Sequence, residues 1–328
     1  MSVGFPRPTD DSTLLVKEHA VSLVFLLQIK NSIMLGAQYS LIAIGFTLFF
    51  GALNVVVFCQ GAFYILATFI GAGLLSLLIG AGHLGPIVFG CVAFAIFFLS
   101  MCLTGLVGVL VERTTIKPFR NAPLVMPILS TIGVGIVIEQ LLKLFYPQGS
   151  NPQVFPEIFP LTGVMLGDLF ISVSELVILA ITIVTLVAIW FFIKKTKIGS
   201  HVVAISQDFE AAALMGINVD RAIMVTFFIG ACLAAIAGFM NGIYYTVFRY
   251  DMGAMAGIKG FSASVVGGLG SVYGAVLGGF LMAFTETFAA AYIPGGSAIR
   301  DVFSFGILLL FLILRPSGII GEKALDKV

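Results

Sequence analysis

The segment KKTKIGSHVVAISQDFEAAALMGINVDR, residues 194–221, is the longest polar interruption between the strongly apolar segments of this chain. Its charges indicate which side of a membrane it faces. Lys194, Lys195 and Lys197 follow one apolar segment, and Arg221 stands at the start of the next. Because Lys and Arg are enriched in cytoplasmic loops of membrane proteins, we expect this segment to lie in the cytoplasm.

Composition places the rest of the chain in a membrane. Hydrophobic residues make up 59% of the 328 residues and charged residues only 10%, which a soluble surface cannot accommodate. The net charge is +1, and the basic residues stand in loops beside apolar segments, which argues against a nucleic-acid partner. We therefore expect an all-α polytopic protein of the bacterial inner membrane, surrounded by lipid.

The apolar segments set the number of membrane crossings. They cover roughly residues 21–50, 61–80, 85–111, 124–146, 171–193, 222–247, 258–292 and 299–315. About 20 apolar residues cross a bilayer as a helix. The pattern predicts about eight membrane segments in one domain, residues 21–315, between a polar N-terminal tail, 1–20, and a C-terminal tail, 316–328.

Loop charges predict the orientation of these segments. Residues 111–123 are basic, and Arg315, Lys323 and Lys327 stand at the C-terminal end, so the loop 111–123 and the tail 316–328 are both expected in the cytoplasm with residues 194–221. The loop 147–170 has no Lys or Arg and contains four prolines, and we expect it in the periplasm. The side of the N-terminus stays open.

This orientation requires the segment 258–292 to enter the membrane and leave it again. The chain starts outside after residue 250 and ends inside, so it needs an odd number of crossings. Three glycines mark the turn: Gly267, Gly268 and Gly270. The inbound part, Ile258–Leu269, spans only about 18 Å as a helix, which predicts a short re-entering helix surrounded by protein.

Residues 194–221 are also predicted to contain a short helix. The sequence favours a helix over Ser206–Met215, ended by Gly216 as a C-terminal glycine, with Asp220 capping the next membrane helix. The apolar residues of this segment are Val202, Val203, Ile205, Phe209, Ala212, Ala213 and Met215. Apolar side chains on a cytoplasmic surface indicate a docking site for a partner, and an ordinary solvated loop is the alternative.

EAAALMGIN, residues 210–218, resembles the coupling segment of ABC importer permeases, in which a helix followed by a glycine sits in a groove of the ATPase subunit. The resemblance extends through DRAIMVTFFIGACLAAIAGFMNGIYY and GIKGFSASVVGGLGSVYGAVLGG to RPSGIIG. Over nearly its whole length after about residue 30, the chain is similar to the branched-chain amino acid permease family of the LivH type.

The resemblance implies an ABC importer permease fold and a permease subunit that takes up branched-chain or related small hydrophobic amino acids. It implies three kinds of partner: a periplasmic binding protein that delivers the substrate, a second homologous permease in a heterodimer, and two ATPase subunits that bind ATP and Mg. The residues implied to contact the ATPase are Phe209, Glu210, Ala212, Ala213, Met215 and Gly216. An ABC permease for another small solute, such as an amide, urea or an aromatic acid, stays open.

The stretch GFTLFFGALNVVVFCQGAFYILATFIG, residues 45–71, contains polar groups within an apolar run. Two interpretations stand: a broken helix whose free backbone lines a cavity on the substrate pathway, or a plain helix in which Asn54 and Gln60 bond neighbouring helices. In the family this stretch has Asn and His shortly before a glycine and an acidic residue after it. Aligned on Gly61, this chain has Val57 and Gln60 at the first two places and Ala62 at the third.

Small residues at four-residue spacing predict close helix packing in two segments. They are Gly230, Ala234, Gly238 and Gly242 in one, and Gly270, Gly274 and Gly278 in the other.

Three charges fall within membrane segments. Glu139 and Lys143 are one helical turn apart, so we expect them to pair and to extend to the outer surface. Glu286 has no partner in its own helix, and Lys259 or Arg300 is expected to neutralise it; a role in the substrate pathway is the alternative.

No catalytic or metal site is predicted. The phosphate-loop pattern GxxxxGK[ST] is absent, so another chain must hydrolyse ATP, and the three His do not form HExxH. The four Cys lie in apolar segments without CxxC or metal spacing. A secondary transporter usually has repeated halves, and this sequence has no convincing internal repeat. A passive channel is the third alternative.

Overall fold

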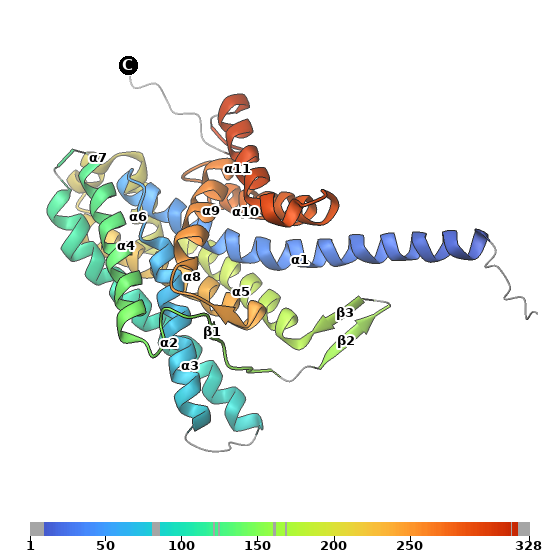
Figure 1. Ribbon diagram of the computed structural model, residues 1–328. Helices are drawn as coiled ribbons and strands as arrows, with labels where there is room; N and C mark the ends of the chain where they lie inside the picture. The colour runs from blue at the N-terminus through green and yellow to red at the C-terminus, as the bar shows by residue number, and fades with distance from the viewer. Residues whose placement is uncertain are drawn as a thin grey trace, which may run out of the picture.

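The computed structural model describes residues 10–80, 86–120, 122–123, 125–159, 162–167, 169–315 and 317–320, without the side chains of residues 10–21, 86, 87, 166 and 210. Helices dominate it, and among the described residues eight are long and apolar enough to cross a membrane. The expected all-α polytopic architecture is therefore confirmed (Figure 1).

The elements follow the predicted apolar segments closely. In chain order the helices are α1 (Asp10–Leu53), α2 (Gln60–Gly80), α3 (Pro86–Val111), η1 (Glu112–Ile116), η2 (Lys117–Phe119), α4 (Val125–Phe145), α5 (Val173–Lys195), α6 (Lys197–Gln207), α7 (Phe209–Leu214), α8 (Val219–Tyr245), α9 (Met252–Gly267), α10 (Val272–Tyr292) and α11 (Gly296–Leu314). Two antiparallel strand pairs join them: β1 (Gln153–Val154) with β4 (Val247–Phe248), and β2 (Gly163–Leu166) with β3 (Leu169–Ser172).

The first helix is longer than the sequence suggested. It begins at Asp10, so residues 10–20 of the expected polar tail 1–20 are helical; residues 1–9 lie outside the described part of the chain. Its 44 residues correspond to about 66 Å at 1.5 Å per residue, roughly twice the thickness of a bilayer core. The N-terminal end of α1 therefore projects from the bundle, on the side of β2 and β3 (Figure 1).

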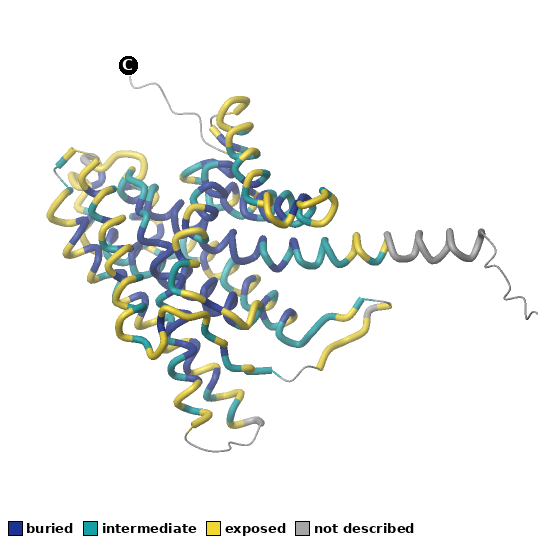
Figure 2. The backbone as a smooth tube through the Cα atoms, in the orientation of Figure 1, coloured by how far each residue is buried: buried dark blue, intermediate teal, exposed yellow. Residues whose placement is uncertain are grey.

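The helices form a buried centre and an exposed periphery. The most apolar window is 83% buried in α1 and 78% buried in α8, against 22% in α4 and α5 and 6% in α11. Figure 2 shows the same gradient from the middle of the bundle outward. Exposed apolar side chains on the peripheral helices suit lipid or a partner chain.

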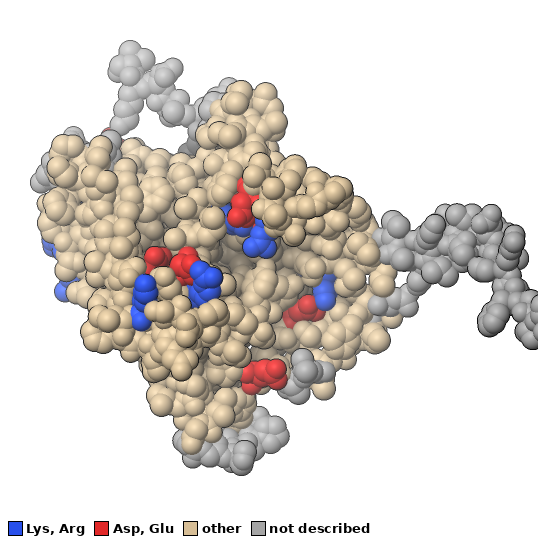
Figure 3. Space-filling view, viewed as in Figure 1, with Lys and Arg blue, Asp and Glu red and all other residues tan. Residues whose placement is uncertain are grey.

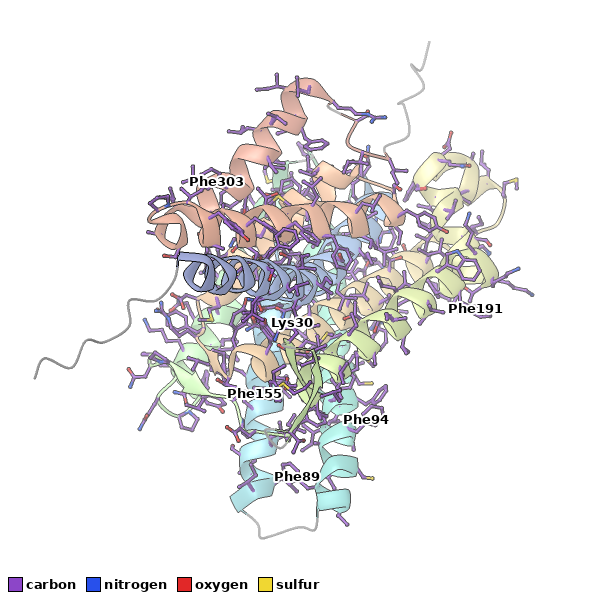
Figure 4. All side chains as sticks on the ribbon, turned by 90° about the vertical axis from the view of Figure 1, so that its right-hand side faces the viewer. Lys30, Phe89, Phe94, Phe155, Phe191 and Phe303 are labelled. Atoms are coloured by element: carbon purple, nitrogen blue, oxygen red, sulfur yellow. The ribbon has the colours of Figure 1, made fainter. Side chains whose placement is uncertain are left out.

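Glycines allow α8 to pack closely in the centre. A Cβ at Gly238 would lie 2.0 Å from the carbonyl oxygen of Tyr64, and one at Gly230 would lie 2.4 Å from the ring of Phe49. Gly242 is packed in the same way by the ring of Phe155, which Figure 4 labels. The small-residue spacing in this segment therefore corresponds to close approaches by α1, α2 and the β1 end of the outer loop.

The re-entering segment is a helical hairpin. α9 has 16 residues, about 24 Å of helix, and α10 runs back beside it. Gly267 lies against Gly274 and Ala263 against Gly278, where a Cβ on either member of α10 would come within 2.2 Å of a carbonyl oxygen. The sequence had placed Gly270 in this packing stripe, and the structure does not. The φ of Gly270 is +93°, no atom lies near its Cβ direction, and it forms the turn with Gly268.

The C-terminal segment also packs on this hairpin. The backbone N–H groups of Ile319 and Ile320 donate to the carbonyl oxygens of Val266 and Gly267. Residues 317–320, at the start of the expected C-terminal tail 316–328, therefore pack on the bundle; residues 316 and 321–328 lie outside the described part of the chain.

The loops divide between two opposite ends of the bundle. Arg120 bonds Asp220, which joins the loop 111–123 to the segment 194–221 at one end. At the other end, β1 of the loop 147–170 pairs with β4. This is the division that the loop charges predict, and which end faces the cytoplasm stays a prediction from those charges.

Candidate functional site

The segment between α5 and α8 forms two short helices instead of the single helix Ser206–Met215 that the sequence favoured. α6 starts at the Thr196 cap, whose side chain accepts a hydrogen bond from the N–H of Gly199. The backbone of Asp208 is extended and separates α6 from α7, and the Asp208 carboxylate accepts from the N–H of Ala211. The segment therefore has a fixed bend at Asp208.

Gly216 ends α7 as predicted. Its φ is +84°, its N–H bonds the carbonyl oxygen of Ala213, and the N–H of Ile217 bonds that of Ala212. These two bonds form the glycine-ended motif that satisfies the last carbonyls of a helix. The cap of α8 differs from the prediction, because Asn218, and not Asp220, accepts the N–H of Arg221.

The bend and the turn decide which side chains face outward. Leu214 and Met215 are 89% and 83% exposed, and Phe209 is 43% exposed. Ala213 is also exposed, whereas Ala212 is buried against the bundle together with two other residues that the sequence had placed on the docking surface: Val202 and Ile205. The side chain of Glu210 lies outside the described residues. We call Phe209, Ala213, Leu214 and Met215 the cytoplasmic apolar surface.

Ion pairs attach this end to the neighbouring loop. Asp220, at the start of α8, pairs with Lys117 at 3.0 Å and with Arg120. Arg120 also pairs with Glu112 at 3.1 Å, and Glu112 is buried. The start of α8, which follows the cytoplasmic apolar surface directly, is therefore held against η1 and η2.

The helix break near residue 54 is present. α1 ends at Leu53, Asn54 has a φ of +53°, and the chain is not helical again until Gln60. The continuous-helix interpretation is therefore wrong. Asn54 is exposed at the break, and Val57, at the family's Asn position, is fully buried.

Gln60 and Gly61 lie at a crossing of four helices. The Nε2 of Gln60 donates to the carbonyl oxygen of Gly230 on α8 at 3.0 Å, and a Cβ at Gly45 on α1 would lie 1.9 Å from that nitrogen. A Cβ at Gly61 would lie 2.1 Å from the carbonyl oxygen of Gly253 on α9. Glycines on three helices thus make room for one carboxamide and one backbone contact.

A buried ion pair joins the re-entering hairpin across its two helices. Lys259 Nζ on α9 lies 2.7 Å from Glu286 Oε1 on α10, and their side chains are 5% and 4% exposed. The other oxygen of Glu286 accepts from the hydroxyls of Tyr39 on α1, at 2.9 Å, and Ser304 on α11, at 3.3 Å. The predicted partner Lys259 is correct, and the carboxylate connects four helices.

The same cluster continues to the surface on α11. Lys259 Nζ also lies 2.7 Å from Asp301 Oδ1, and Arg300 Nε lies 3.6 Å from Glu286 Oε1. Asp301 and Arg300 are 37% and 54% exposed. We call Lys259, Glu286, Arg300 and Asp301 the outer charge cluster, because it lies toward the end opposite the cytoplasmic apolar surface.

The expected pair of Glu139 with Lys143 is not formed. Lys143 Nζ lies 5.1 Å from the centre of the Tyr250 ring. Lys143 therefore contacts an aromatic ring in the loop before α9 and not the carboxylate of Glu139.

The comparison with known proteins identifies the family. The family model described as branched-chain amino acid transport system / permease component matches residues 28–312. The chain belongs to this family. It is 33% identical to the high-affinity branched-chain amino acid transport system permease protein BraD of Pseudomonas aeruginosa, over 93% of this chain and 98% of that protein. It is also 33% identical to the LivH permease protein of Escherichia coli K12, over the same shares, and 28% identical to the galactose/methyl galactoside import permease protein MglC of Haemophilus influenzae, over 58% of this chain and 57% of that protein.

In this permease, two of the four predicted pathway residues meet the short helix α9: Gly61 at Gly253, and Glu286 through its ion pair with Lys259. Gln60 instead bonds Gly230 on α8. Asn54 stands apart at the helix break. The sequence had offered no sign of Tyr39 or Asp301, because each joins the cluster only through the packing of its helix.

The permease shows no arrangement for metal chemistry in the part of the chain that the structure describes. No group of three or more His, Cys, Asp or Glu side chains could hold an ion there.

Proposed function

We propose that this permease is one membrane subunit of an ATP-dependent ABC importer in a bacterial inner membrane. It takes up branched-chain or related small hydrophobic amino acids that a periplasmic binding protein delivers. The names of the BraD and LivH relatives, which match nearly their whole length, support this substrate class.

The observation that carries the proposal is the cytoplasmic apolar surface. Leu214 and Met215 are almost fully exposed at the end of α7. The conformation of this helix is fixed by the Asp208 cap at one end and by the Gly216 turn at the other. Large apolar side chains fixed in this way are favourable only when a partner covers them. The resemblance of this segment to a coupling helix supports an ATPase subunit as that partner.

The proposed complex contains two permease and two ATPase subunits. The second permease is a homologous but different chain, and the ATPase subunits bind ATP and Mg. The sparsely buried helices α4 and α11 offer apolar area for a second permease. This permease contributes no phosphate loop, so it transmits the ATPase movement without hydrolysing ATP.

Reconstitution tests the proposal. The permease is co-expressed with the permease, ATPase and binding-protein genes that neighbour its own, and the purified complex is placed in liposomes with ATP inside. Leucine uptake should require ATP and the binding protein and should persist when an ionophore removes ion gradients. Uptake that an ionophore abolishes would indicate a secondary transporter, and uptake by this chain alone, without ATPase subunits, would exclude the proposed role.

The same liposomes test the substrate class. Competition with unlabelled valine and isoleucine should reduce leucine uptake, whereas urea, a short amide, an aromatic acid and galactose should not. If one of these solutes is transported instead, the importer assignment stands and the branched-chain assignment fails.

A further inference from the structure

Arg300 has an unused guanidinium at the exposed side of the outer charge cluster. Its Nε lies 3.6 Å from Glu286 Oε1 and 3.8 Å from Asp301 Oδ1, both beyond hydrogen-bond distance. Among the described residues no side-chain hydrogen bond from Arg300 is formed, and 54% of the side chain is exposed. Arg presents five N–H donors in a planar fork that fits a carboxylate with two parallel bonds. The fork of Arg300 is therefore free for an outside carboxylate.

Asp301 offers the complementary group beside it. One of its oxygens lies 2.7 Å from Lys259 Nζ, and its second oxygen takes part in no ion pair within the described residues. The side chain is 37% exposed, so this carboxylate can accept from a cation that arrives from outside. Arg300 and Asp301 thus present one free positive and one half-free negative group within 3.8 Å of each other.

The charge balance of the cluster selects the kind of ligand. Two cations, Lys259 and Arg300, face two carboxylates, Glu286 and Asp301, and two of these four side chains are at most 5% exposed. A ligand with net charge would leave an uncompensated charge in this weakly solvated place, which is costly. A zwitterion adds one charge of each sign and keeps the cluster neutral.

The aromatic side chain of Tyr245 is half-exposed near this cluster. The Tyr245 ring at the end of α8 is within electrostatic reach of both Glu286 and Arg300, and 46% of the residue is exposed. Figure 3 shows a face that is hollowed at its centre, with charged side chains of both signs gathered around the hollow. Another ion pair joins Lys30 on α1, labelled in Figure 4, to Glu175 on α5 at 2.8 Å.

We propose that Arg300 and Asp301 form a binding site for the zwitterionic head of an α-amino acid as it passes from the binding protein into the permease. This inference rests on the proposed function and names the recognition site within it. The guanidinium of Arg300 donates two hydrogen bonds to the α-carboxylate, and Asp301 accepts from the α-ammonium. The Tyr245 ring packs against the apolar side chain.

Lys259 and Glu286 are positioning residues in this site. Lys259 lies 2.7 Å from one oxygen of Asp301, and Glu286 pairs with Lys259 inside the bundle. Because α9 carries Lys259, a movement of the short helix alters the position of Asp301. Amino-acid release is thereby connected to α9, which contacts α2 and α10.

Direct binding tests the site. The purified complex without binding protein is studied by saturation-transfer NMR with leucine, with leucinamide, which lacks the carboxylate, and with 4-methyl-2-oxopentanoate, which lacks the ammonium. Leucine should receive saturation from the wild-type protein, and each of the other two should receive at least threefold less. Arg300→Gln and Asp301→Asn should each reduce the leucine signal at least fivefold. Arg300→Gln should leave the weak leucinamide signal unchanged, because that probe has no carboxylate for Arg300 to bind.

Two further variants separate recognition from folding. Arg300→Lys keeps the charge balance but not the fork, so it should assemble normally and still lower the leucine signal at least threefold. Arg249→Gln is the matched control, because Arg249 pairs with Asp251 at the same end and is 46% exposed; it should leave the signal within twofold of wild type. Equal leucine signals in wild type and Arg300→Lys, or equal loss in Arg249→Gln and Arg300→Gln, would overturn the site.

The two hypotheses fail in different ways. If wild-type liposomes show ATP-dependent leucine uptake but Arg300→Gln has the wild-type leucine signal, the site is wrong and the importer function stands. If the wild type binds leucine through Arg300 but shows no ATP-dependent uptake, the site stands and the importer function is wrong.

Discussion

Ion pairs of nearly the same length stand at the two ends of this bundle, in opposite surroundings. At the end that carries the cytoplasmic apolar surface, Lys117 lies 3.0 Å from Asp220, with side chains that are 55% and 53% exposed. In the outer charge cluster Lys259 lies 2.7 Å from Glu286, with side chains that are 5% and 4% exposed. Water screens the first pair and is nearly absent from the second. Burial, and not distance, therefore decides how much each pair matters to the fold.

Apolar side chains show the reverse arrangement. The cytoplasmic apolar surface exposes Leu214 and Met215, whereas the outer charge cluster buries the charged groups of Lys259 and Glu286 inside the bundle. Each region departs from the usual rule that apolar groups are buried and charges are solvated. Both departures fall at the two proposed contact sites: the ATPase docking surface at one end and the amino-acid site at the other.

The largest expected effect comes from Glu286→Gln. The substitution leaves Lys259 buried with one carboxylate instead of two and removes the charge that Tyr39 and Ser304 bond. Breaking a buried ion pair costs about 3–5 kcal/mol. Because Asp301 still pairs with Lys259, we expect a loss of about 3 kcal/mol. Thermal unfolding of the purified complex should show a clear fall in stability. The double variant Glu286→Gln/Lys259→Met should regain part of it, and a single variant as stable as wild type would contradict the importance of burial.

Leu214→Ser tests the other departure. Burying a leucine side chain stabilises a contact by about 1.5–3 kcal/mol, so losing it should weaken ATPase binding by about 10- to 100-fold. The permease itself should stay as stable as wild type, because Leu214 is 89% exposed. Met165→Ser is the control, since Met165 is 69% exposed on β2 at the opposite end. Equal ATPase affinity in both variants would remove the cytoplasmic apolar surface as a docking site.

Gly216→Val should have a smaller effect on energy but a clear effect on coupling. At a φ of +84° a residue with a Cβ is strained by about 1–2 kcal/mol, and a β-branched one at least as much. No neighbouring atom obstructs the Cβ direction, so the strain should shift α7 and leave the bundle folded. The variant should express normally, keep its basal ATPase activity and lose stimulation by loaded binding protein. Uptake within about twofold of wild type would show that this segment is an ordinary solvated loop without a coupling role.

Lys117→Gln should have the smallest effect. It removes one exposed ion pair, which contributes about 0.2–1 kcal/mol, while Arg120 still bonds Asp220. Stability and uptake should stay close to wild type at 0.15 M salt, roughly physiological. A loss as large as that of Glu286→Gln would show that this end is less hydrated than its exposure indicates.

The sequence predicted the fold well wherever a signal is local. Apolar runs of about twenty residues predicted the membrane helices. Loop charges predicted which loops share an end of the bundle, and the structure places them at two opposite ends in the same way. Gly216 and the glycines of the hairpin turn were found because a positive φ favours glycine whatever surrounds it. The family signature near Gly61 was also visible as a break, since Asn54 and Gln60 interrupt an otherwise continuous apolar run.

Several features could not be found in this way. Lys143 lies over the Tyr250 ring instead of pairing with Glu139, because folding brings that ring close. Asn218 caps α8 instead of Asp220, because two polar residues two positions apart compete for the same cap. The exposure of Leu214 depends on the bend at Asp208, which rotates α7 relative to α6.

By itself, the sequence determined which segments enter the membrane, where they turn and which loops share a side, because hydrophobicity, charge and glycine act over a few residues. Only the tertiary structure decided which groups meet inside. Lys259, Glu286 and Asp301 are 27 and 15 residues apart along the chain, yet one ammonium lies 2.7 Å from both carboxylates. That meeting depends on close packing of α9, α10 and α11, since a buried charge is stable only where the whole bundle supplies its partner.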